Sequence, residues 1–389
     1  MKQRLAAVAL GLVAAIGPAL LPADPARADV IRDDEWHLRY LNVTEANQHT
    51  RGEGVTVAVV DRGVDRAHQD LAGAVLDPVY VTQPAEPAPE IDPDGHGTAL
   101  AGLIAGQGHG AGRADGVIGI APAAKVMPVV IDTPAGQAPS PDEIAAGIEL
   151  AVAQRAAVIV VGYSVAGSER LLKAVRAARD AGALVVAADG DQPGSAFEPY
   201  PAAYDGVLAA IPLSRAGDVL VPSSSGRRLG LGVPGVQVMT TNNGNRYRID
   251  DGSASPGVLG GAVALLRSAY PQAKPDEIVR RLRLSAVDAG ERGPDPQNGL
   301  GRLDLVQALT RRLPAPTPSA PAGSASVGVS PSATPVAAPA VPRSRGPYGW
   351  LLGLPLLAVI AGVGAYAGLA ERRIRISARN EVDSVGVQS

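Results

Sequence analysis

The sequence predicts an α/β fold in which a central, mostly parallel β-sheet carries helices on both faces. Short β-branched runs alternate with helical stretches along residues 54–309, an order typical of parallel sheets. These runs are apolar throughout rather than alternating, as expected of strands buried on both faces. None of the 389 residues is a cysteine, so the fold depends on this core and not on disulfide bonds.

Five apolar runs are the predicted strands, and two amphipathic stretches are the predicted helices. The strands are expected at residues 54–61, 124–131, 156–164, 183–189 and 206–212. The helices are expected at residues 140–155 and 168–182. Each helix begins with a serine suited to cap its N-terminus, and the second ends on a glycine. In such folds, functional groups gather at the carboxyl ends of the strands.

The two ends of the chain predict export and a membrane anchor. Residues 1–28 have the basic start, apolar run and A-R-A site of a secretory signal peptide; an N-terminal membrane anchor is the alternative. Residues 29–53 are an N-terminal extension, and 54–311 are the folded domain. Residues 312–347 form a Pro/Ala/Ser-rich linker, whose composition does not support a packed core.

Residues 348–371 contain an uncharged apolar stretch long enough to cross a bilayer. The arginines of the tail 372–389 place that tail in the cytoplasm. A buried core helix is the alternative, but the linker in front and the basic tail behind argue against it. The prediction is therefore a single-pass protein of the cell membrane with its main domain outside. A net charge of −3 gives no support for a nucleic-acid partner.

Asp61 and His96 are the first candidates for catalysis. Asp61 ends a predicted strand just before a glycine turn, where it can orient a histidine; a turn-capping Asp is the alternative. His96 lies between glycines before a small-residue helix, where a substrate backbone can come close. The remaining histidines lack this setting and are assigned to the surface or to packing: His37, His49, His68 and His109.

Asp92, Asp94 and His96 are an alternative candidate, for a metal site. It is disfavoured because no second histidine or carboxylate pair stands at metal-ligand spacing. Neither a metal nor a cofactor is predicted.

An Asp, then a His, then a Ser that opens a small-residue helix is the chain order of one class of Ser-His-Asp hydrolases. The segments around these residues resemble, in order, landmarks of the subtilase family: VAVVDRGVDRAHQDL, GHGTALAGLIAG, GIAPAAKVMPV, LVVAADGD, YPAAYDGVLA, VPGVQV and NGLGRLDLVQAL. The resemblance implies a subtilisin-like three-layer fold, with His96 as general base and Asp61 steadying it. The mature start, linker and anchor are similar to the mycosins, membrane-bound subtilases associated with type VII secretion, although this chain has no cysteine.

Two departures from the family pattern affect catalysis. Asp191 stands at the position of the asparagine that stabilises the oxyanion. Loss of one such donor typically costs about 2.7–4 kcal/mol in barrier, and an ionised carboxylate there adds like charge. Val160 and Gly162 stand where the substrate-binding strand is expected to have Asn and Ser.

The family pattern G-T-S-x-A-x-P fits the stretch DDGSASP in two registers. Aligned on Ala254 and Pro256, the nucleophile position falls on Gly252; aligned on the downstream helix, it falls on Ser253. The first register adds a residue inside a buried helix and rotates its face by about 100°. The second keeps the helix continuous, with Pro256 in its first turn. We therefore predict that Ser253 opens the helix as nucleophile, with Gly252 as the alternative register.

These observations lead to two functional hypotheses. The first is an extracytoplasmic serine endopeptidase with impaired activity, which acts on a protein or peptide substrate and is associated with type VII secretion. The second is a pseudoprotease that keeps the fold as a scaffold or binding module of a secretion complex. A cell-wall-binding module is a third possibility, but nothing in the folded region suggests a glycan-binding surface.

Overall fold

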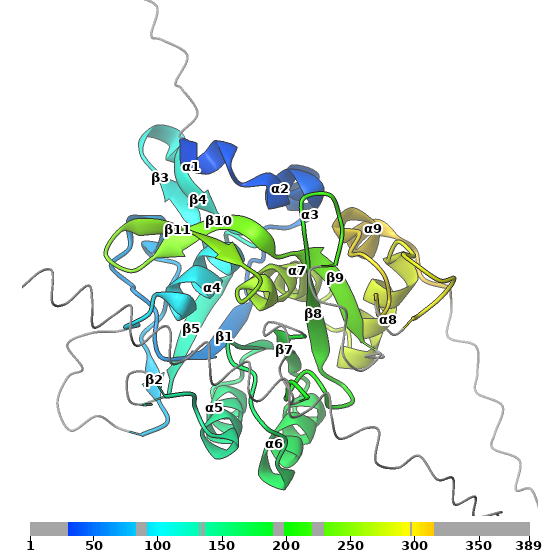
Figure 1. The fold of residues 1–389 in the computed structure, drawn as a ribbon. Helices are drawn as coiled ribbons and strands as arrows, with labels where there is room; N and C mark the ends of the chain where they lie inside the picture. The colour runs from blue at the N-terminus through cyan, green and yellow to red at the C-terminus, as the bar shows by residue number, and fades with distance from the viewer. Residues whose placement is uncertain are drawn as a thin grey trace, which may run out of the picture. The chain divides into compact units, whose positions relative to one another are not determined.

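A parallel sheet of seven strands forms the centre of the protein (Figure 1). The computed structural model describes residues 30–82, 92–131, 133, 137–189, 198–219, 229–295 and 298–314. Along the sheet the strand order is β2-β5-β1-β6-β7-β8-β9, and all neighbouring pairs are parallel. This arrangement confirms the predicted α/β class.

All five predicted strands are present in the sheet. The sheet strands are β1 (Thr56–Asp61), β2 (Val79–Tyr80), β5 (Lys125–Val130), β6 (Val158–Val161), β7 (Leu184–Ala188), β8 (Leu208–Leu213) and β9 (Gly230–Pro234). Two antiparallel hairpins lie outside it: β3 (Gln107–His109) with β4 (Asp115–Ile118), and β10 (Val236–Asn242) with β11 (Arg246–Asp251).

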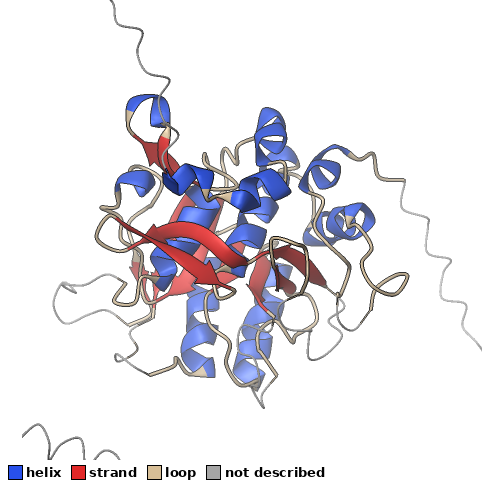
Figure 2. Ribbon diagram, turned by 45° about the horizontal axis from the view of Figure 1, so that its top comes forward, coloured by secondary structure: helices blue, strands red, loops and turns tan. Residues whose placement is uncertain are grey.

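Helices cover both faces of the sheet, as Figures 1 and 2 show. The helices are α1 (Val30–Asp33), α2 (Trp36–Tyr40), α3 (Val43–His49), α4 (His96–Ala105), α5 (Pro141–Ala153), α6 (Glu169–Asp180), α7 (Ser255–Ala269), α8 (Pro275–Ser285) and α9 (Leu305–Thr310), with short 3-10 turns at η1 (Gln69–Leu71) and η2 (Ala111–Arg113). Helices α5 and α6 pack on one face, and α4 and α7 on the other.

Successive residues of one strand enter two separate apolar cores. In β1, Val57 and Val59 belong to the core on the α4 and α7 side, whereas Ala58 and Val60 belong to the core on the α5 and α6 side. All four side chains are at most 1% exposed. Because strand side chains alternate between faces, this double burial explains why the sequence of the strand is continuously apolar.

The predicted helix caps are confirmed. The Ser140 hydroxyl accepts the N–H of Glu143 at 3.2 Å, and the Glu143 carboxylate accepts the N–H of Ser140 at 2.7 Å, which forms a capping box. The Ser168 hydroxyl accepts the N–H of Leu171 at 3.1 Å. Gly182, just after α6, has a φ of 88°, a left-handed conformation that glycine adopts without strain.

The N-terminal extension packs against the folded domain through α2. Trp36 is 3% exposed, and its indole N–H donates to the carbonyl of Gln237 in β10 at 2.9 Å. Among the described residues, no helix has the length and apolarity needed to cross a membrane. The predicted signal peptide, most of the linker, the membrane span and the tail lie outside the described residues.

The β10–β11 hairpin connects the sheet to α7 and lies over α4 (Figure 1). The hydroxyls of Thr240 and Thr241 donate to the carbonyls of Ala99 and Thr98 in α4 at 2.8 and 2.7 Å. The hairpin is therefore fixed to the helix that begins at His96.

Helix α7 begins two residues later than the sequence predicted. Its first residue is Ser255, its N-cap is Ala254, and Pro256 lies in the first turn as expected. Gly252 has a φ of 118°, far from helical values. Residues 252–254 therefore form the turn before the helix.

Candidate active site

Asp61 and His96 form a hydrogen-bonded pair at the carboxyl end of β1. Asp61 is the last residue of β1 and fully buried, and His96 is the first residue of α4. The His96 Nδ1 atom lies 2.9 Å from Asp61 Oδ2, and Asp61 Oδ1 accepts the N–H of Arg62 at 2.8 Å. This geometry holds the imidazole in one orientation, with Nε2 directed away from β1.

Two glycines leave the space that this pair needs. A Cβ atom at Gly162 would lie 1.9 Å from Asp61 Oδ2, and one at Gly97 would lie 1.9 Å from the carbonyl oxygen of Gly63. The Gly162 position, where the family resemblance implies a serine, therefore tolerates no larger side chain around this Asp61 rotamer.

The surroundings of His96 favour its protonated form. Burial lowers the pKa of the imidazole, but the charge and hydrogen bond of Asp61, the charge of Asp250 and the carbonyl of Ser253 outweigh burial and raise the pKa to about 9. Near neutral pH the ring is then an imidazolium with two N–H donors. It has no lone pair with which to accept a proton from a nucleophile.

The second N–H of His96 faces a backbone carbonyl rather than a hydroxyl. His96 Nε2 lies 3.3 Å from the carbonyl oxygen of Ser253. The hydroxyl of Ser253 instead donates to Asp250 Oδ2 at 2.8 Å. The structure thus brings Ser253 beside His96, but by its backbone, and it does not place the serine proton on the imidazole. Gly252, the alternative position, contributes no side chain.

Asp250 is a site residue that sequence reasoning missed. It is 1% exposed, and its Oδ1 atom accepts the N–H groups of Gly252 at 3.1 Å and Ala254 at 2.8 Å. Its position, three residues before a serine that follows a strand, resembles that of an ordinary turn-capping aspartate. No periodicity in the sequence distinguishes it from the adjacent Asp251.

Three carboxylates meet behind the Asp61–His96 pair. Asp61, Asp92 and Asp94 each direct one oxygen into a region less than 4.8 Å across. Such a cluster has the right chemistry for a hard cation. The guanidinium of Arg62 already lies against it, 3.1 Å from Asp94 Oδ2, and His96 supplies a second positive charge. Protein cations therefore balance much of the charge that a metal would neutralise.

Asp92 is about half protonated near neutral pH. Burial and the nearby charge of Asp61 raise its pKa to about 7, although the hydrogen bond from Thr98 opposes this. The backbone N–H of Thr98 donates to Asp92 Oδ2 at 2.7 Å. Asp92 therefore acts in part as a neutral acceptor that caps the first turn of α4.

Tyr163 lies beside His96 and is a second site residue that was not predicted from the sequence. Its ring lies 5.8 Å from the His96 ring, and the Arg62 guanidinium lies 5.7 Å from the tyrosine ring centre. Its hydroxyl donates to Asp94 at 3.4 Å. Burial, followed by the charges of Asp61 and Asp94, raises the pKa of Tyr163 above its usual value, so the phenol stays neutral.

The other predicted positions contribute less or lie outside the described residues. Asp191, the predicted oxyanion position, is not among them. Val160 is fully buried in the sheet and belongs to the core. Of the remaining histidines, His37 and His68 are buried, His49 is exposed, and His109 pairs with Asp70 at 2.6 Å.

Comparison with known proteins identifies the family. The profile of the subtilase family matches residues 52–301. The chain belongs to the subtilase family. Fervidolysin from Fervidobacterium pennivorans is 32% identical over 317 residues, covering 73% of this chain and 45% of fervidolysin. This subtilase therefore spans less than half the length of that relative.

Solved structures of subtilases share the fold. MycP1 with its N-terminal propeptide removed has a TM-score of 0.60 at 25% identity, covering 72% of this chain and 98% of MycP1. MycP3, a protease from the type VII (ESX-3) secretion system, has a TM-score of 0.58 at 26% identity, covering 71% of this chain and 88% of MycP3. The family and the fold of the chain are therefore those of a subtilase.

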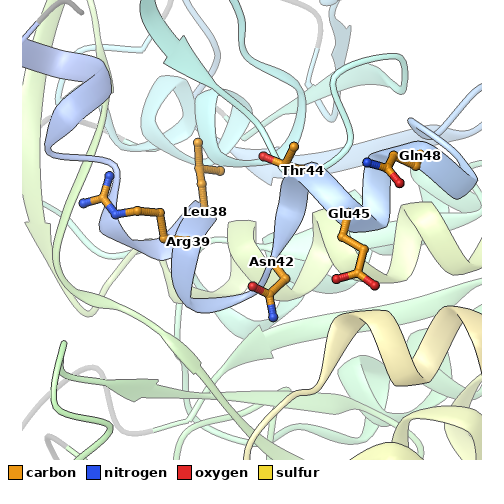
Figure 3. A pocket seen from close by; sticks show the side chains of 6 residues that line it. All are labelled: Leu38, Arg39, Asn42, Thr44, Glu45 and Gln48. Carbon is orange, nitrogen blue, oxygen red and sulfur yellow. The ribbon is translucent and has the colours of Figure 1, made fainter.

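A surface hollow on the N-terminal extension is lined by none of the candidate catalytic residues. It has a volume of about 540 Å³ and is lined by Leu38, Arg39, Asn42, Thr44, Glu45 and Gln48, as Figure 3 shows. All six residues come from α2, α3 and the turn between them. None belongs to the Asp61, His96 and Ser253 set.

Proposed function

We propose that this subtilase is a membrane-anchored, mycosin-like protein that binds peptide segments of a secreted protein and hydrolyses them slowly at best. The observation that carries the proposal is the pairing at residue 253. His96 Nε2 faces the carbonyl of Ser253 at 3.3 Å, while the Ser253 hydroxyl donates to Asp250. In the family mechanism the imidazole must instead take the proton of the nucleophile.

The charge of the histidine supports the same conclusion. With its pKa raised to about 9, chiefly by Asp61 against the effect of burial, His96 is protonated over most of the physiological range. A protonated imidazole cannot be the general base, and only a small fraction of molecules near pH 7 have the neutral form. The expected activity is therefore low, and rises with pH.

Residues 348–371 and the likeness to MycP1 and MycP3 support the cellular setting. In this proposal the apolar segment anchors the chain in the cell membrane, with the subtilase domain outside. The protein then acts beside the type VII secretion membrane components, as a scaffold or peptide-binding module. Alkaline carbonate extraction of membranes, with protease treatment of intact cells, tests the anchor and its orientation. Release by carbonate, or a domain protected from protease, would contradict it.

A working endopeptidase is the second candidate function, because the Asp61–His96 pair is fully assembled at 2.9 Å. Rotation of the Ser253 side chain would then supply the nucleophile. Its proton passes to His96, its oxygen attacks the peptide carbonyl, and the proton is later given to the leaving amine.

One experiment separates the two candidates. The full chain in detergent is incubated with an internally quenched peptide library, with fervidolysin as positive control, and binding of the same peptides is followed by fluorescence polarisation. The proposal expects binding, with turnover close to that of Ser253→Ala at pH 7 and rising only slightly toward pH 9. Rapid turnover that Ser253→Ala and His96→Gln both abolish would establish the endopeptidase.

A further inference from the structure

The loop that enters α7 is organised around one buried carboxylate. Asp250 is 1% exposed and accepts three hydrogen bonds: the N–H of Gly252 at 3.1 Å, the N–H of Ala254 at 2.8 Å and the hydroxyl of Ser253 at 2.8 Å. The Arg248 guanidinium lies 3.4 Å from Asp250 Oδ2. Both carboxylate oxygens are therefore engaged by the residues that a nucleophile loop would use.

The backbone N–H groups of Gly252 and Ala254 both donate to Asp250. Backbone N–H groups at the start of a helix are donors for negatively charged oxygen, and subtilase-type catalysis needs such donors for the oxyanion of its intermediate. Here the N–H groups of Gly252 and Ala254 converge on Asp250 Oδ1. Both N–H groups beside Ser253 are thus already satisfied by an internal carboxylate and are not free for another oxygen.

The serine hydroxyl is held by the same side chain. A hydrogen bond to a charged acceptor is stronger than one between neutral groups. While the Ser253 proton is donated to Asp250, it is not donated to His96, whose Nε2–H faces the Ser253 carbonyl.

We propose that Asp250 is an autoinhibitory positioning residue, which holds the Ser253 hydroxyl and the backbone N–H groups of the loop away from the reacting atoms. The inference deepens the proposed function and rests on it, because it names the contact that keeps hydrolysis low. Arg248 supports this arrangement, because it also donates to the carbonyl of Asp94, beside His96, at 3.3 Å.

The substitution Asp250→Asn separates this role from ordinary loop capping. The amide oxygen of asparagine can still accept the N–H groups of Gly252 and Ala254, which keeps the loop folded. Its NH₂ group replaces Oδ2 and is a donor only, so it cannot accept the hydroxyl proton of Ser253. If Asp250 only capped the loop, Asp250→Asn would have little effect on the protein.

A fluorophosphonate probe reads out the freed serine. Ser253 Oγ forms a bond to phosphorus, the P–F bond breaks, fluoride leaves, and the hydroxyl proton passes to neutral His96. The full chain is labelled at several values between pH 7 and pH 10, and mass spectrometry measures the rate of modification at Ser253. The matched control is Asp251→Asn, which changes the neighbouring carboxylate, bonded to the N–H of Gln237 at 3.1 Å.

The expected result is labelling at least about tenfold faster in Asp250→Asn than in the wild type, the factor that about 1.4 kcal/mol gives. Asp251→Asn should label at the wild-type rate. NMR titration should show a lower His96 pKa in Asp250→Asn, because one nearby negative charge is gone. The groups that face His96 otherwise remain: Asp61, Tyr163 and the Ser253 carbonyl.

The inference is overturned if Asp250→Asn labels less than tenfold faster while its thermal unfolding stays like that of the wild type. If Asp250→Asn unfolds, the test moves to Arg248→Gln, which removes the guanidinium that supports the arrangement of Asp250. Labelling of Ser253 should then be at least about tenfold faster than in the wild type, and a smaller change in a folded variant overturns the inference. Wild-type peptide turnover decides the proposed function separately, because this inference depends only on the ratio between variant and wild type.

Discussion

Raising the pH through the pKa of His96 is expected to destabilise the folded protein. The pKa rises from an ordinary value of 6.5 to about 9, mainly because Asp61 outweighs the effect of burial. Each pKa unit corresponds to about 1.4 kcal/mol, so the protonated ring stabilises the fold by about 3 kcal/mol. Because the folded pKa is the higher one, this contribution is complete below pH 6.5 and is lost as the pH approaches and passes 9.

Urea unfolding of the wild type and His96→Gln at pH 6.5, 8 and 9.5 measures this contribution. Glutamine has no charge to lose, so the wild type should lose about 3 kcal/mol more than the variant between pH 6.5 and 9.5. Tyr163 has a pKa raised above its usual value, so its ionisation does not enter this window. If the difference between the two proteins is constant with pH, His96 is neutral, and the argument for a blocked general base fails.

Three further changes test the surroundings of the site. Asp92→Asn keeps an acceptor for the Thr98 N–H. Burial and Asp61 raise the Asp92 pKa from 3.8 to about 7, so the wild type should lose up to about 4 kcal/mol of unfolding free energy between pH 4 and pH 7. Urea unfolding at both pH values should show this loss in the wild type and not in the variant. Gly162→Ala places a Cβ 1.9 Å from Asp61 Oδ2, so we expect a loss of about 1–3 kcal/mol and, by NMR, a His96 pKa nearer 6.5; an unchanged titration would contradict the assigned Asp61 rotamer. Trp36→Ala removes a side chain that is 3% exposed, so thermal and urea unfolding should show a loss of about 3–5 kcal/mol in unfolding free energy. Limited proteolysis should also cut the N-terminal extension faster in the variant. Equal cleavage rates would mean that Trp36 does not hold the extension.

The apolar runs and the helix-capping serines in the sequence were sufficient to predict the fold, because each of these patterns corresponds to one local structure. Continuous apolar runs such as residues 54–61 are stable only when both faces are covered, and the alternation of Val57 and Ala58 between two cores is the observed form of that cover. The serine caps of α5 and α6 were predictable for a similar reason, because they depend on residues three positions apart.

The Asp61–His96 pair was also predictable, since a strand end and a helix start meet at the same edge of a parallel sheet. The orientation of Ser253 was not. It depends on the left-handed conformation of Gly252 and on a buried carboxylate three residues earlier, and neither leaves a periodic signal.

By itself, then, the sequence determined the class of fold, the strand that carries Asp61 and the helix that carries His96, because hydrophobic periodicity and end signals act over a few neighbouring residues. Only the tertiary structure decided which atom of residue 253 faces the imidazole, and that Asp250 takes its hydroxyl proton. The physical reason is that a side-chain rotamer in a loop is selected by the hydrogen bonds and charges around it, which the fold assembles from β11, α4 and α7 together.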